Sequence, residues 1–212
     1  MQHQIKQIAV PDEWVISGGR GVTVAVVDSH FNRNNHRIKK YYTISNGGVY
    51  GDSHCSAVCD IISSVAPFCD IIISQAMVNK TGTCDSLLRA VSNIKDEDFD
   101  VINFSLSTSD DNADIRSLIH KISQRALVVA AMANNGSISY PAQYDFSTSV
   151  SSYKRDWINA DIYCDDSFIV GNKTKKSGNS MSTAFVSGIF ALAKSYDKNI
   201  TKEEIIKQLL GR

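Results

Sequence analysis

Short runs of apolar, mostly β-branched residues recur along the chain, separated by stretches in which apolar positions follow a helical spacing. A run of about 4–8 residues that is apolar throughout is typical of a strand in a sheet buried on both faces. Four short, mainly apolar runs come close to this description and are predicted to be strands: residues 22–27, 71–73, 101–104 and 127–131.

Helices are predicted between and after these runs. The segment following His54 repeats apolar residues at helical spacing, as do residues 86–95 and 115–124. Residues 180–194 are small and apolar on all sides, which predicts a helix buried in the centre of the fold. Residues 201–210 begin with a Thr-x-x-Glu capping-box pattern, which predicts a last helix.

The alternation of strands and helices predicts an α/β fold with a mostly parallel central sheet and helices on both faces. In such sheets, functional side chains gather at the carboxyl ends of the strands. The length of 212 residues favours one large domain, residues 1–212, over two small ones. A hydrophobic content of 43% is enough to supply a core for it.

Charge and targeting signals narrow the range of partners. Lys+Arg and Asp+Glu number 22 each, so the formal net charge is zero and gives no electrostatic reason to expect nucleic acid or an anionic membrane as a partner. No apolar stretch approaches the length of a membrane span, and the N-terminus lacks the apolar run of a secretory signal. We therefore expect a cytoplasmic protein that binds neither nucleic acid nor membrane.

The cysteines are odd in number and lack the spacing of a zinc site; they are Cys55, Cys59, Cys69, Cys84 and Cys164. Cys55 and Cys59 could share a helix face, which leaves a metal site open as an alternative, although structural zinc normally needs four ligands. Buried free thiols in a reducing compartment are the favoured interpretation. No metal and no cofactor are expected.

Three residues carry candidate chemistry, and each has an ordinary alternative. Asp28 follows the first strand, where a cleft is expected, but an aspartate there is more often a turn or capping residue. His54 begins a predicted helix, and alone it could be a surface or capping histidine. Ser180 precedes the buried helix among small residues that allow close approach of a substrate, although a serine at a helix N-terminus is usually a cap. Negative charge is favoured at that helix end.

Taken together, the three residues follow the chain order of the subtilisin triad: Asp, His, Ser. The surrounding segments resemble those of the subtilisin-like serine protease family, the subtilases, and the resemblance extends from Val10 to Leu210. In order along the chain, the similar segments are Val24–Ser29, Gly51–His54, Val101–Leu106, Ala130–Gly136, Tyr140–Ala142 and Gly178–Met181.

The resemblance implies a subtilisin-like three-layer fold and a role for each matching residue. Ser180 would be the nucleophile, His54 its general base and later the acid, and Asp28 the group that orients the imidazole. Asn134 would donate its amide to the oxyanion, together with the backbone N–H of Ser180. The neighbouring Asn135 is the alternative, and the alignment with the glycine after it favours Asn134.

The same resemblance suggests where a peptide or protein substrate binds. An extended substrate is expected to add to the strand edge formed by Ser105, Leu106 and Ser107. The pocket for the residue before the cleaved bond is expected to have one wall formed by Ala131, Met132 and Ala133, with Ser139 near its floor.

Several positions depart from the family pattern. His30, Ser107 and Ala133 stand where glycines are usual, and Asn179 replaces a threonine. None of these changes removes a catalytic group, but added bulk at Ser107 and Ala133 argues for restricted specificity. The calcium-binding insertion that often follows the helix after His54 is absent, so no calcium requirement is expected there. We also expect no inhibitory prosegment, because the resemblance begins within the first turns of the chain.

The expected function is therefore a cytoplasmic serine endopeptidase of narrow specificity, for example one that removes a leader or matures a specific peptide. Two alternatives remain open at this point. The first is a catalytically inactive relative that keeps the fold as a binding or scaffold protein. The second is an acyl-transferring peptide ligase, because an acyl-enzyme reacts with an amine as well as with water.

Overall fold

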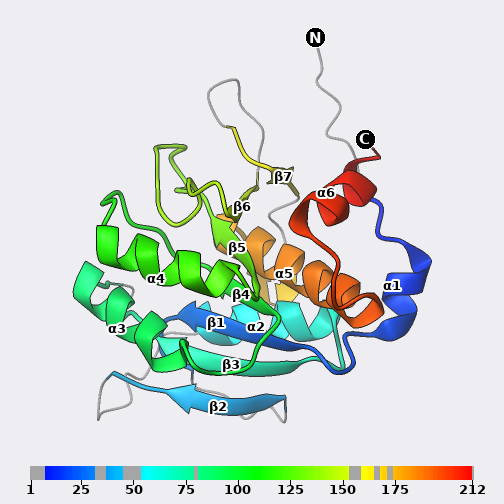
Figure 1. Cartoon of the computed structure of the whole chain (residues 1–212), viewed down its shortest axis with the longest axis horizontal. Coiled ribbons are helices and arrows are strands. Elements are labelled where there is room, and N and C mark those ends of the chain that lie inside the picture. Colours follow the sequence, from blue (N-terminus) through cyan, green and yellow to red (C-terminus); the bar gives the residue numbers. More distant parts are fainter. Residues whose placement is uncertain are drawn as a thin grey trace.

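The computed structural model describes residues 8–31, 37–44, 54–78, 81–152, 159–164, 168–170 and 174–211. Strands and helices alternate through most of this chain, as Figure 1 shows. The strands are β1 (Thr23–Asp28), β2 (Ile38–Tyr42), β3 (Asp70–Gln75), β4 (Val101–Phe104), β5 (Leu127–Ala131), β6 (Ser147–Ser151), β7 (Ile162–Tyr163), β8 (Phe168–Val170) and β9 (Thr174–Lys176). The helices are α1 (Asp12–Ser17), α2 (His54–Val65), α3 (Cys84–Ile94), α4 (Ala113–Ser123), α5 (Asn179–Tyr196) and α6 (Lys202–Leu210).

The central sheet has seven strands in the order β2-β3-β1-β4-β5-β6-β7, and every neighbouring pair is parallel. β1 lies between β3 and β4, so Val24 is paired with Ile71 on one side and with Val101 on the other. β8 and β9 form a separate antiparallel pair. The predicted α/β architecture and its parallel sheet are confirmed.

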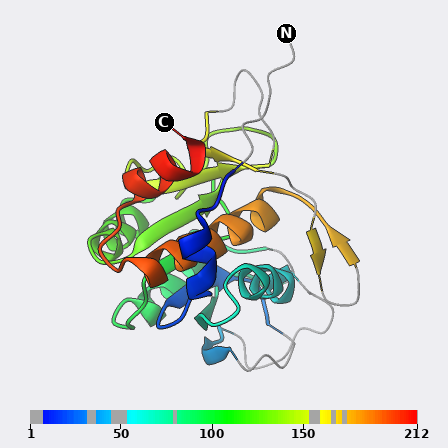
Figure 2. The ribbon, with the colours of Figure 1, turned by 90° about the vertical axis from the view of Figure 1, so that its right-hand side faces the viewer.

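Helices cover both faces of the sheet, which gives three layers (Figures 1 and 2). Along β1 the side chains alternate between these layers, as the twofold period of a strand requires. Val24 and Val26 belong to the core beneath α1, α2, α5 and α6. Ala25 and Val27 belong to the core beneath α3 and α4. Because both faces are covered, the strand is apolar at all four of these positions.

The α5 helix is the buried helix that the sequence predicts. Its residues are small and apolar on every side, and it packs against α1, α2 and the sheet. The contact with α2 is close at Gly188, where an added Cβ would lie 2.6 Å from the Cβ of Val65. The α6 helix begins with the predicted capping box, in which Thr201 Oγ1 accepts from the backbone N–H of Glu204.

Six elements were not predicted from the sequence: α1, β2, β6, β7, β8 and β9. β6 is Ser-Thr-Ser-Val-Ser, yet all five residues are buried. Both the backbone N–H and the hydroxyl of Ser149 donate to Asp161 Oδ2, at 2.8 and 2.9 Å, whereas the buried hydroxyls of Ser147 and Thr148 have no hydrogen-bond partner among the described residues. α1 is a single short helix whose Trp14 is fully buried.

The five cysteines are all free thiols, and only Cys84 is partly exposed. Within the part of the chain that the structure describes, no group of three or more His, Cys, Asp or Glu side chains is placed to hold a metal ion. The described helices also include none that is both long enough and apolar enough to cross a membrane.

Candidate active site

Asp28 and His54 meet at the carboxyl edge of the sheet. Asp28 is the last residue of β1 and is fully buried, whereas His54 is the first residue of α2 and its side chain is 29% exposed. His54 Nδ1 lies 2.8 Å from Asp28 Oδ1, and the same oxygen accepts the backbone N–H of Ser29 at 2.6 Å. The bond between His54 Nδ1 and Asp28 Oδ1 fixes the plane of the imidazole. It leaves Nε2 as the ring nitrogen that can face a substrate.

Ser180 lies in the first turn of α5, where backbone N–H groups have no partner within the helix. Its hydroxyl donates to the backbone carbonyl of Ser105 at 2.8 Å, and the Ser105 hydroxyl donates to the carbonyl of Ser180 at 2.9 Å. Ser105 directly follows β4, so these reciprocal bonds fasten the start of α5 to the end of that strand. The helix begins after Gly178, whose φ of 113° is rarely adopted by residues other than glycine.

Asn134 lies beside this turn, three residues beyond the end of β5. It is exposed, and its Oδ1 accepts the backbone N–H of Asn179 at 3.2 Å. A Cβ added to Gly178 would lie 3.6 Å from the same oxygen, so the asparagine packs directly against the helix start. The amide nitrogen Nδ2 would lie 4.0 Å from the same Cβ.

The two segments expected to bind substrate are joined by a backbone bridge. Thr108 and Tyr140 exchange N–H···O bonds of 2.9 and 2.8 Å, which brings the chain after Ser107 alongside the chain after Ser139. Ser139 is buried, and its hydroxyl accepts the backbone N–H of Ala133 at 2.9 Å. Ser139 therefore contacts the segment predicted to form the pocket wall, and its place near the pocket floor stays a prediction.

A cavity of about 360 Å³ opens beside this edge, between the start of α3 and the chain after β4. Leu106 and Ser107 line it, together with Met77, Cys84 and Leu87. The sequence analysis did not single out these last three residues. In the sequence, Cys84 and Leu87 are three residues apart, as on one face of a helix. That spacing by itself indicates packing and not a binding site.

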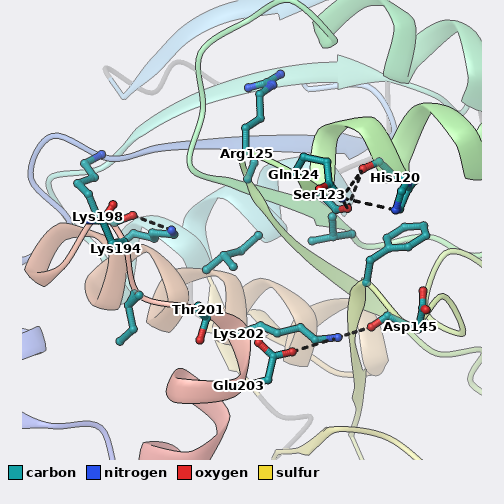
Figure 3. Close-up of a pocket in the computed structure, with 16 residues that line it drawn as sticks. His120, Ser123, Gln124, Arg125, Asp145, Lys194, Lys198, Thr201, Lys202 and Glu203 are labelled. Carbon is teal, nitrogen blue, oxygen red and sulfur yellow. Dashed lines mark hydrogen bonds and ion pairs between the residues drawn. The ribbon is translucent and has the colours of Figure 1, made fainter.

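A larger hollow, of about 570 Å³, lies at the opposite edge of the sheet, where β5 begins and α5 ends (Figure 3). Its lysines donate to main-chain carbonyls, and Lys198 also pairs with Asp100 at 2.6 Å. Lys202 Nζ donates to the carbonyls of Asp145 and Ser147, and Lys194 Nζ donates to the carbonyl of Lys198. The hollow contains none of the sequence-predicted site residues.

His30, two residues beyond Asp28, takes part in a separate hydrogen-bond group. Its Nδ1 lies 2.9 Å from the hydroxyl of Tyr41, which donates to Gln75 Oε1 at 3.3 Å. Burial raises the pKa of Tyr41 above its usual value, so this hydroxyl stays protonated at neutral pH. Residues 51–53 of the predicted histidine motif lie outside the described residues.

A carboxylate bonded to a histidine and a serine at a helix start are groups that acyl transfer from a peptide bond uses. In the structure the Ser180 hydroxyl donates to the Ser105 carbonyl, and the partner of His54 Nδ1 is Asp28. Residues 19–212 match the model of the Subtilase family, and the chain belongs to that family. The predicted family, fold and enzyme class are thus confirmed, and the enzyme acts on peptide or protein substrates.

Named relatives agree with this assignment. The chain is 24% identical to the "Intracellular serine protease" of Paenibacillus polymyxa, across 98% of this chain and 78% of that protein. It superposes with a TM-score of 0.76 on a cold-adapted subtilisin-like serine proteinase, at 21% identity, covering 92% of this chain and 83% of the other. The prenylagaramide maturation protease PagA is also similar, with a TM-score of 0.72 and 19% identity over 88% of this chain and 80% of that one.

Proposed function

We propose that Asp28, His54 and Ser180 form the catalytic triad. The observation that carries the proposal is the 2.8 Å bond between the fully buried Asp28 carboxylate and Nδ1 of His54. A buried carboxylate in this position selects the imidazole tautomer and stabilises the imidazolium that forms during the reaction. The partly exposed His54 ring is then the base that removes the proton from Ser180.

In the proposed reaction, Ser180 Oγ attacks the carbonyl carbon of the peptide bond while its proton moves to His54 Nε2. The tetrahedral intermediate collapses when His54 returns the proton to the leaving amine, and water then hydrolyses the acyl-enzyme by the same route. Asn134 Nδ2 and the Ser180 N–H are the proposed donors to the oxyanion. Support for this pairing comes from Asn134 packing against the first turn of α5.

Substrate binding is proposed to release the Ser180 hydroxyl. In the free protein this hydroxyl donates to the carbonyl of Ser105, which lies on the edge where an extended substrate would add. When a backbone N–H of the substrate donates to the Ser105 carbonyl, that carbonyl no longer competes with His54 for the proton of the Ser180 hydroxyl. The hydroxyl then has the imidazole of His54 as its acceptor, so the nucleophile is activated when the cleft is occupied.

Narrow specificity is proposed to arise on both sides of this edge. Ser107 and Ala133 carry side chains where the family pattern has glycine, and Ser139 supports the wall at Ala133. The cavity beside Leu106 is also lined by Met77 and Cys84 and by the hydroxyl-bearing residues Thr83, Thr108 and Ser109, so it offers a substrate side chain both apolar contact and hydrogen-bond partners.

The proposed biological role is cytoplasmic cleavage of a restricted set of substrates, such as leader removal or maturation of a specific peptide. Two observations support it: one relative is named an intracellular protease and one structural neighbour a maturation protease. Profiling a peptide library with the purified protein would identify the preferred sequence, and mass spectrometry of the products would separate hydrolysis from transfer to an amine.

A fluorophosphonate probe tests the triad directly. We expect labelling at Ser180 in the wild-type protein and none in Ser180→Ala. Ser195→Ala is the matched control, because that serine lies at the far end of α5 and donates to the carbonyl of Arg20. Folded wild-type protein that is not labelled, or labelling that persists in Ser180→Ala, would contradict the proposal.

A further inference from the structure

Asn179, the residue before Ser180, has a buried side chain whose partners come from two strands. It is 1% exposed, and its side chain points away from the cleft into the ends of β5 and β6. The carboxamide uses both of its functions there. Nδ2 donates to the carbonyls of Met132 and Ala133, at 2.9 and 3.3 Å. Oδ1 accepts both the backbone N–H and the hydroxyl of Ser152, each at 2.7 Å.

These bonds fasten the start of α5 to the strand ends that surround the cleft. Met132 and Ala133 directly follow β5, and Ser152 directly follows β6. A buried amide with donors and acceptors all satisfied holds one orientation, because breaking any of the bonds leaves an unpaired polar group inside the protein. The position of Asn179 relative to both strands is therefore sharply defined.

The backbone of Asn179 links this fixed position to Asn134 and Ser180, the two residues proposed to act on the substrate. Its N–H is the donor that holds Asn134 Oδ1, at 3.2 Å, and Ser180 is the next residue. Asn134 is exposed, so packing constrains its carboxamide less than it constrains a core side chain, and the bond from Asn179 is one contact that orients it. An oxyanion donor contributes only when it is already aimed at the developing charge.

We propose that Asn179 is a positioning residue that aligns the Asn134 amide with the Ser180 hydroxyl by anchoring the first turn of α5 to β5 and β6. This inference rests on the oxyanion role proposed for Asn134. Asn179 stands where the family pattern has threonine. A threonine side chain has a single hydroxyl, which cannot donate to the β5 carbonyls through one group and accept from Ser152 through another.

Two substitutions at this position test the inference. Asn179→Ala removes all four side-chain bonds, and Asn179→Asp keeps the acceptor for Ser152 but turns a carboxylate oxygen toward the carbonyls of Met132 and Ala133. For both we expect kcat on a cleaved fluorogenic peptide to fall by about 10- to 100-fold, with KM within about threefold, because transition-state alignment is lost rather than substrate binding. An equal loss through KM alone would overturn the proposal.

A double-mutant cycle with Asn134→Ala separates positioning from general stability. If Asn179 acts through Asn134, we expect Asn179→Ala to change kcat by less than about threefold in the Asn134→Ala background. Fully additive losses would overturn the inference. Thr201→Ala is the control, because it removes the cap of the remote α6 helix and should lower the unfolding temperature without changing kcat.

Ser152→Ala keeps the test decisive if the Asn179 variants do not fold. It removes one of the two bonds to Asn179 Oδ1 and leaves the backbone bond in place. We expect a fall in kcat of about three- to tenfold that disappears in the Asn134→Ala background; an unchanged kcat would overturn the inference. Failure of the underlying function looks different: Asn134→Ala alone would then leave kcat unchanged.

Discussion

Single side chains around the cleft differ sharply in burial, and burial sets their chemistry. Asp28 is fully enclosed, whereas His54, Ser180 and Asn134 each keep access to solvent. A carboxylate that is shielded from water interacts more strongly with the imidazole beside it. The three accessible groups are those that must touch a substrate, so the division matches the proposed roles.

The same contrast between buried and accessible groups predicts the reactivity of two cysteines. Desolvation raises the pKa of the Cys69 thiol to about 12, and the neighbouring Asp70 acts in the same direction. Because the thiolate is the reactive species, its fraction at pH 8 is then on the order of one in ten thousand. Iodoacetamide should therefore modify the partly exposed Cys84 in the native protein while Cys69 stays unmodified, as peptide mass spectrometry would report.

Cys84→Ser should abolish the rapid modification, and addition of denaturant should make Cys69 reactive. Modification of Cys69 in the folded protein at the rate of Cys84 would contradict the burial described for it. Protection of Cys84 by a bound peptide product would further link the cavity beside Leu106 to substrate binding.

At this scale the sequence could predict residue types but not their bonds. Asp28, His54 and Ser180 are ordinary residues individually, and their order along the chain made them a candidate site. The bonds from Asn179 to Met132 and Ser152 join segments separated by dozens of residues. Such partners depend on where the strand ends lie in space, which no local pattern encodes.

Among the elements, the packing of α2 against α5 has a direct consequence for the site. α2 begins with His54 and α5 carries Ser180 in its first turn, so the spacing of these helices sets the spacing of the two side chains. The helices approach closely at Gly188, where any Cβ would lie 2.6 Å from the Cβ of Val65. Packed cores accommodate such overlap only by shifting whole elements.

Gly188→Ala is therefore expected to impair both stability and activity. Overpacking should cost about 1–3 kcal/mol of unfolding free energy, and displacement of α2 from α5 should lower kcat. Chemical denaturation and peptide hydrolysis measure the two effects. Adding Val65→Gly, which removes the Cβ and the methyl group that an added side chain at 188 would meet, should restore kcat and part of the stability. An unchanged stability and kcat in Gly188→Ala would show that the helices do not constrain one another.

The elements that could be predicted are those whose burial is visible in their composition. The apolar runs of β1, β3, β4 and β5 and the all-round apolar α5 were predicted from that signal alone. β6 could not be, because four of its five buried residues are serines or threonine, and Ser149 reaches its polar partner only in Asp161, outside the strand. Its position depends on its partners, and those are distant in sequence.

For the whole molecule, the proposed site lies along one edge of the sheet, at the carboxyl ends of its strands. β1, β4 and β5 end there, and α2 and α5 begin there. Residues from five elements therefore keep their relative positions only while the sheet and its helices remain packed. The integrity of the connections between these elements matters to the activity as much as the core does.

The connection between α2 and β3 is where the family pattern often has a calcium-binding insertion, and here it spans only residues 66–69. It is held by main-chain bonds: Phe68 N–H donates to Gly18 at 2.8 Å, and Asp70 N–H donates to Val22 at 2.9 Å. These bonds tie it to the chain leading into β1. Main-chain hydrogen bonds therefore hold this connection in place, at the position where a bound calcium ion would hold a longer loop.

We accordingly predict that removing calcium leaves the stability unchanged. An ion bound only to the native state at 100 times its dissociation constant would add about 2.7 kcal/mol, which for a chain of this size corresponds to a Tm shift of about 5–10 °C. Calorimetry in EDTA and in millimolar CaCl₂ should give Tm values within about 1 °C, with MgCl₂ as the control for ionic effects. A calcium-specific rise of about 5 °C or more would mean that an ion stabilises the fold after all.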